Sequence, residues 1–130
     1  MKIAAVTEDG QTISQHFGRA PYYLVLTVEE GQIVGREMRD KLGHAQFAGG
    51  PHVEDPRGHG YGAHAEDRHA RMAQAIADCQ VLLAGGMGWG ARESLEQRGI
   101  RVVMTDIADI QQAVQAYLAG TLVERPDLLH

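Results

Sequence analysis

Residues 81–95 read Val-Leu-Leu-Ala-Gly-Gly-Met-Gly-Trp-Gly-Ala-Arg-Glu-Ser-Leu. The first four residues of this stretch are apolar and predict a short buried strand. Glycines follow at positions 85, 86, 88 and 90, and a helical pattern begins at Ala91. A strand, a glycine loop and a helix in this order direct backbone N–H groups and the positive end of the helix toward one point. That arrangement suits an anionic ligand.

The glycine loop matches neither of two well-defined phosphate-binding motifs. It lacks the Lys-Ser/Thr pair of a P-loop, and its third glycine falls one residue too early for a dinucleotide-binding fingerprint. Alternatively, the glycines only allow a tight turn between strand and helix. The loop alone leaves both interpretations open.

The composition is ordinary for a single globular domain. The chain has 130 residues, of which 44% are hydrophobic and 22% charged. A net charge of −5 argues against a general nucleic-acid binder. The N-terminus begins as a strand and not as a signal peptide, and no apolar run is long enough to span a membrane. We therefore expect a cytoplasmic protein without nucleic-acid or membrane partners; the sequence does not indicate its oligomeric state.

Apolar patterns predict five strands and three helices along the chain. We expect strands at residues 2–6, 22–28, 33–38, 81–84 and 100–104, and helices from about 63 to 78, 91 to 98 and 109 to 119. A loop at about 43–64, rich in glycine and histidine, is inserted after the third strand, and its length is typical of a functional or disordered segment. The domain thus spans 1–123, and 124–130 forms a C-terminal tail that frays or packs loosely.

This order of elements predicts the topology. Right-handed crossovers make the first, fourth and fifth strands parallel, and the second and third form a hairpin. The simplest result is a single-domain, three-layer α/β fold with a mixed five-stranded sheet in the order 3-2-1-4-5. In such sheets ligands bind where the strand order reverses, here between the first and fourth strands. We therefore expect the loop at 7–19 to meet the glycine loop.

Three motifs point to a family. They are Ser14-Gln15-His16-Phe17-Gly18-Arg19-Ala20, Asp78-Cys79-Gln80-Val81 leading into Gly85-Gly86-Met87-Gly88, and Thr105-Asp106-Ile107. Together they resemble the dinitrogenase iron–molybdenum cofactor biosynthesis family. The resemblance implies a ribonuclease H-like fold. Because the family includes nitrogenase accessory proteins that hold anionic iron–molybdenum–sulfur clusters, it also implies a non-enzymatic carrier in cofactor assembly, storage or transfer. Its partners would be cluster-donating and cluster-accepting proteins.

The cysteine content limits how such a cluster is held. A protein-built iron–sulfur cluster usually needs about four thiolates, whereas this chain has only Cys79, expected as a small core residue. A cluster must therefore bring its own sulfides. We expect it to be held by His16, Arg19 and the loop residues Gly85, Gly86, Met87, Gly88, Trp89 and Gly90, with Arg92 as a further counter-charge.

Two of these side chains have alternative roles. His16 is the leading metal ligand, since it lies in the loop at the switch point, but it could instead form hydrogen bonds within its own loop. Trp89 stands where many relatives have a small residue or proline. It could shield a bound cluster or cover the end of the sheet, and the covering role is favoured.

The inserted loop suggests a second function. His44, His52, His59 and His64 lie in glycine-rich chain, where imidazoles can reach a metal ion without the constraint of a helix. The alternative to a cluster carrier is therefore a sensor or buffer for a mononuclear transition metal such as Zn²⁺, Ni²⁺ or Cu²⁺. His69 shares an apolar stripe with its helix and is expected as a core histidine. A third possibility is a regulatory domain that binds a small anion or nucleotide at the glycine loop.

Little in the sequence indicates an enzyme. Nucleases with a ribonuclease H-type site need several inward carboxylates to hold two Mg²⁺ ions, and no predicted strand carries a central Asp or Glu. Ser14 and Ser94 lack the sequence of a hydrolase nucleophile elbow. We therefore expect a binding protein and not an enzyme.

Overall fold

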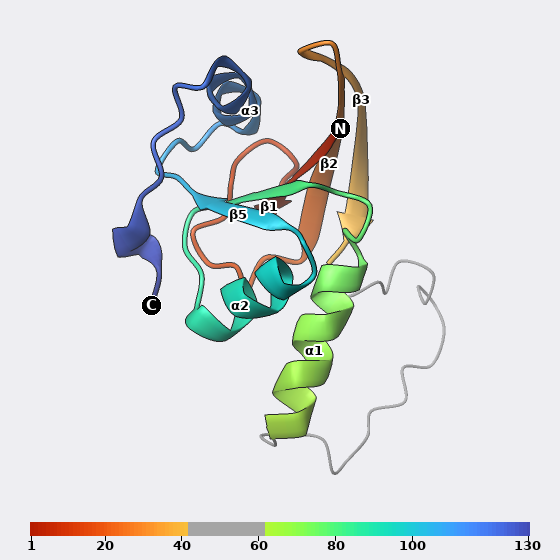
Figure 1. The fold of residues 1–130 in the computed structure, drawn as a ribbon, viewed down its shortest axis with the longest axis vertical. Helices are drawn as coiled ribbons and strands as arrows, with labels where there is room; N and C mark the ends of the chain where they lie inside the picture. Colours follow the sequence, from red (N-terminus) through yellow and green to blue (C-terminus); the bar gives the residue numbers. More distant parts are fainter. Residues whose placement is uncertain (42–61) are drawn as a thin grey trace.

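The computed structural model describes residues 1–41 and 62–130, and these form a mixed sheet with helices on both faces (Figure 1). The strands are β1 (Lys2–Thr7), β2 (Tyr22–Glu29), β3 (Gln32–Asp40), β4 (Val81–Ala84) and β5 (Arg101–Met104). Their order is β3-β2-β1-β4-β5, which confirms the predicted topology. β1 pairs in parallel with β4, and β4 with β5, while β2 is antiparallel to both β1 and β3.

The helices complete three layers. They are α1 (Gly62–Gln74), α2 (Trp89–Gln97) and α3 (Ile110–Ala119), and a short 3-10 turn, η2 (Pro126–Leu128), follows near the C-terminus. Figure 1 shows α1 and α2 on one side of the sheet and α3 on the other. The α/β architecture is therefore as predicted, and its classification as ribonuclease H-like remains a prediction. No helix in the described ranges is both long enough and apolar enough to cross a membrane.

Helix α1 ends four residues earlier than the apolar pattern suggests. The pattern continues to Ile76, but beyond Gln74 the chain tightens into turns, with Ile76 N donating to Ala73 O at 3.2 Å. Arg39 on β3 donates to the carbonyl of Ala75 at 2.9 Å and to Asp78 at 2.6 Å. These bonds from the sheet satisfy groups that a longer helix would have satisfied itself. The pattern of side chains could not show this.

The ends of α3 are as the sequence predicts. The side chain of Asp109 accepts a hydrogen bond from Gln112 N at 2.9 Å, and Gly120 ends the helix with a φ of 76°. A carboxylate at the N-cap and a left-handed glycine after the last turn are the common ways to satisfy free backbone groups at helix ends.

Two titratable side chains of the core, those of Tyr23 and Cys79, are buried. The hydroxyl of Tyr23 donates to Met72 O at 2.8 Å, and burial raises the pKa of this phenol. Cys79 is 4% exposed, and burial raises the pKa of its thiol to about 12. The expectation that Cys79 is a core residue is confirmed, and its thiol stays protonated at neutral pH.

The C-terminal tail is better packed than predicted. Arg125 N donates to Met104 O at 2.8 Å, and Met87 N donates to Leu128 O at 3.3 Å. His130 also exchanges main-chain hydrogen bonds with the glycine loop, donating to Met87 O at 2.9 Å and accepting from Trp89 N at 3.0 Å. The expectation of a loose tail was wrong, because the segment pairs with the loop through its backbone.

Candidate functional site

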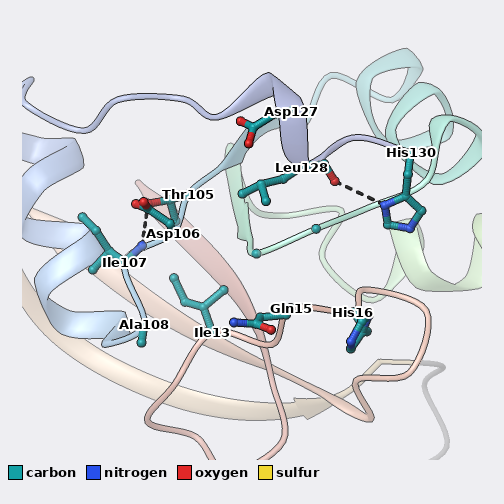
Figure 2. Close-up of a pocket in the computed structure, with 12 residues that line it drawn as sticks. Ile13, Gln15, His16, Thr105, Asp106, Ile107, Ala108, Asp127, Leu128 and His130 are labelled. Atoms are coloured by element: carbon teal, nitrogen blue, oxygen red, sulfur yellow. Dashed lines mark hydrogen bonds between the residues drawn. The ribbon is translucent and has the colours of Figure 1, made fainter.

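Two loops meet at the carboxyl ends of β1 and β4, where the strand order reverses. Gly85 N donates to Ser14 O at 3.0 Å, and Phe17 N donates to Gly86 O at 3.1 Å. The predicted convergence of the loop at 7–19 with the glycine loop is therefore confirmed. Beside this contact lies a cavity of about 380 Å³, called here the first cavity (Figure 2). It is lined by Ile13, Gln15, His16, Gly85, Gly86, Thr105, Asp106, Ile107, Ala108, Asp127, Leu128 and His130.

Two of the glycines are required by the close approach of these loops. A Cβ atom on Gly86 would lie 2.5 Å from Gln15 O, and one on Gly85 would lie 2.8 Å from Ser14 O. Both contacts are with main-chain atoms, which cannot rotate away. A Cβ on Gly88 would lie 3.5 Å from His130 O, an ordinary contact. The packing of one loop on the other thus explains Gly85 and Gly86 without any ligand.

Several N–H groups of the glycine loop already have partners in the protein. Those of Gly85, Met87 and Trp89 donate to the main-chain oxygens of Ser14, Leu128 and His130. The expectation of a cradle of free N–H groups is therefore not met at these three positions. An anion at this loop would need other donors or positive charges.

The backbone around His16 is held by local hydrogen bonds. His16 N donates to the hydroxyl of Ser14 at 3.1 Å, and that hydroxyl donates to His16 O at 3.3 Å. His16 O also accepts from Arg19 N and Ala20 N at 3.0 and 3.1 Å. These bonds fix the loop while the exposed imidazole borders the first cavity.

The first cavity carries acidic groups on the side away from His16. Arg125 bonds to Asp106 at 2.6 Å and to Asp127 at 2.8 Å, and the guanidinium lowers the pKa of the Asp127 carboxyl. One guanidinium compensates only one of these two carboxylates. Figure 2 shows His16 and His130 on one side of the cavity and the segment 105–108 on the other.

A second cavity, of about 360 Å³, lies between α1, α2 and the loop after β1. It is lined by Phe17, Gly18, Arg68, His69, Met72, Gly88, Gly90, Ala91 and His130, and none of these described residues is Asp or Glu. Close by, the buried amine of Lys41 donates to Phe17 O and lies 4.3 Å from the centroid of the Phe17 ring. Burial and the charge of Arg68 lower the pKa of Lys41 to about 8. The second cavity is therefore the more positive of the two.

Other predicted site residues lie elsewhere. Arg19 is exposed and lines neither cavity. Arg92 forms ion pairs with Glu96 at 3.3 Å and Glu124 at 3.4 Å, so its charge is compensated. The Trp89 side chain is 68% exposed, which contradicts the expectation that it covers the end of the sheet.

The histidines divide into two groups. His44, His52 and His59, with most of the inserted loop at 43–64, lie outside the described residues, and His64 belongs to the first turn of α1. His69 is half-buried and lines the second cavity, where its Cε1 atom is 3.1 Å from the position of a Cβ on Gly90. Within residues 1–41 and 62–130, no three His, Cys, Asp or Glu side chains are grouped to hold one metal ion.

The contribution of the tail to the two cavities was not predicted from the sequence. Asp127, Leu128 and His130 line the first cavity, and His130 lines the second as well. The tail carries no periodic pattern or motif that could have indicated this, because main-chain hydrogen bonds place it. Arg68, which borders the second cavity from α1, had no sequence signal either.

Comparisons with known proteins agree with this architecture. No curated protein matches the chain. Among solved structures, PH0822 has a TM-score of 0.70 at 22% identity, with 98% of this chain and 99% of that chain covered. The apo form of the orange protein from Desulfovibrio gigas has a TM-score of 0.65 at 24% identity, with 95% and 92% covered. At these identities the likeness shows the fold alone. A family model described as dinitrogenase iron–molybdenum cofactor matches residues 1–120, and the chain therefore belongs to this family.

Proposed function

We propose that this chain binds an anionic metal–sulfur cluster, of the iron–molybdenum type or a related one, and carries it without a catalytic step. The observation that supports this most directly is the meeting of the His16 loop and the glycine loop at a cavity of about 380 Å³. That volume lies within the range of small-ligand sites. Membership of an iron–molybdenum cofactor family supports the same class of ligand.

The available donor atoms fit a cluster that arrives with its own sulfides. The only thiol, Cys79, is buried, and its pKa is raised to about 12, so it offers no thiolate. The exposed imidazole of His16 can bind a metal through a neutral ring nitrogen. A pre-assembled cluster needs only such a terminal ligand and a surface that tolerates negative charge.

The distribution of charge supports an anion on the side of the second cavity. Arg68 lines that cavity, Lys41 lies close to it, and its described lining residues include no Asp or Glu side chain. The acidic groups of the first cavity lie on the side away from His16 (Figure 2). A cluster bound at His16 would therefore be most stable with its negative sulfides toward Arg68.

A carrier of this kind requires cluster-donating and cluster-accepting proteins as partners. The alternative, a mononuclear metal sensor or buffer, depends on His44, His52, His59 and His64. Ligand exchange at an exposed site would serve transfer between proteins, whereas a buffer would need several histidines around one ion.

The test is anaerobic purification from the native host, followed by elemental analysis and an absorption spectrum. We expect molybdenum or iron with sulfide, and sulfide-to-metal charge-transfer bands. His16→Ala should lose most of the bound metal, while the triple variant with alanine at 44, 52 and 59 should keep most of it. A colourless protein with one metal ion, lost in the triple variant and kept in His16→Ala, would replace the carrier by the metal buffer.

A further inference from the structure

The C-terminal segment holds a second histidine at the same site. Residues 125–130 follow the glycine loop in parallel, and main-chain hydrogen bonds join Leu128 and His130 to Met87 and Trp89. Arg125 bonds to Asp106 at 2.6 Å, which fixes the other end of the segment near β5. His130 is therefore placed by its own backbone, independently of its ring. This segment lies beyond the residues 1–120 that the family model matches.

The surroundings of the His130 ring indicate which of its two nitrogens carries the proton in the neutral form. Its Nδ1 atom lies 3.3 Å from Leu128 O, a main-chain acceptor. In the neutral ring this geometry places the proton on Nδ1, where it donates to the carbonyl, and leaves the lone pair on Nε2. A backbone carbonyl that fixes the tautomer in this way is a common feature of histidines that bind metals.

His130 also occupies a special position between the two cavities. It is the one described residue that lines both of them. In Figure 2 its ring lies on the same side of the first cavity as His16. The two imidazoles thus come from opposite ends of the chain and border the same space.

We infer that His130 is a second imidazole ligand for the bound cluster and that, with His16, it completes the coordination of one exposed iron. This inference rests on the proposed function. A tetrahedral iron that already has two bridging sulfides needs two more ligands, and pairs of histidines serve this purpose in Rieske centres. Each imidazole would displace a solvent ligand, with no change in oxidation state. Among the described residues no third His, Cys, Asp or Glu is grouped with the pair to hold a mononuclear ion, which favours a metal that brings its own sulfides.

The test uses the anion formed anaerobically from tetrathiomolybdate and Fe²⁺ as a defined iron–molybdenum–sulfide probe. Binding is followed by metal and sulfide content and by quenching of the fluorescence of Trp89, the only tryptophan in the sequence. The main-chain N–H of Trp89 donates to His130 O. We expect the wild-type chain to bind one equivalent, with two nitrogen donors to iron by X-ray absorption. In His16→Ala and His130→Ala, affinity should fall at least about tenfold, and one nitrogen donor should remain.

Two further variants serve as controls. His130→Gln keeps the main-chain bonds and a polar side chain but has no imidazole, so it should behave as His130→Ala does. The triple variant at 44, 52 and 59 should bind as the wild type does. The inference would be overturned if His130→Ala bound the anion with wild-type affinity and two nitrogen donors while His16→Ala lost binding. That result would leave the proposed function standing. A wild-type chain that binds no iron–molybdenum–sulfide anion would overturn the proposed function itself.

Discussion

Replacing Gly86 by alanine should destabilise the protein far more than the same change at Gly88. The new Cβ at position 86 would lie 2.5 Å from Gln15 O, so the two loops must move apart. Overpacking of this kind costs about 1–3 kcal/mol. Separation also weakens the hydrogen bond from Phe17 N to Gly86 O, which is 3.1 Å long. Loss of such a bond costs about 1 kcal/mol. The expected loss is therefore about 2–4 kcal/mol of the free energy of unfolding.

Gly88→Ala is the matched control. Its Cβ would make only an ordinary contact, 3.5 Å from His130 O, and its φ of −81° suits any residue. We expect a change within about 1 kcal/mol, the difference between glycine and alanine at an N-cap. Urea unfolding followed by circular dichroism measures both variants, and the slope m shows whether the transitions are comparable. Equal stability of the two variants would refute the steric explanation for Gly86.

Two other stability predictions follow from buried polar groups. Because burial lowers the pKa of Lys41 to about 8 from its ordinary 10.5, the folded chain loses this proton before the unfolded chain does. The free energy of unfolding of the wild type should therefore rise between pH 8 and 10.5, by up to about 3 kcal/mol relative to Lys41→Met. A difference that does not vary with pH in urea titrations would contradict the burial of this amine. Tyr23→Phe should cost about 1–3 kcal/mol in thermal or urea unfolding, because it leaves Met72 O without its buried donor; a neutral result would count against this bond.

The order of the strands and the meeting of the His16 loop with the glycine loop could be predicted from the sequence, for physical reasons. Apolar runs such as Val81–Ala84 mark buried strands, and the handedness of crossovers fixes their order. The meeting of His16 with the glycine loop follows from that order. The tail could not be predicted, since the bonds that place His130 are made by backbone groups of Met87 and Trp89, which any residue carries. The early end of α1 depends on Arg39, a residue of a distant strand.

The burial of the only cysteine has a consequence for work with this protein in air. Thiol oxidation proceeds through the exposed thiolate, and Cys79 is both 4% exposed and protonated at neutral pH. The folded chain therefore offers no reactive thiol of its own. In a sample loaded with the proposed cluster, bleaching or sulfide release on exposure to oxygen would therefore not arise from a protein thiol. Likewise, Cys79 should remain a free thiol after such exposure.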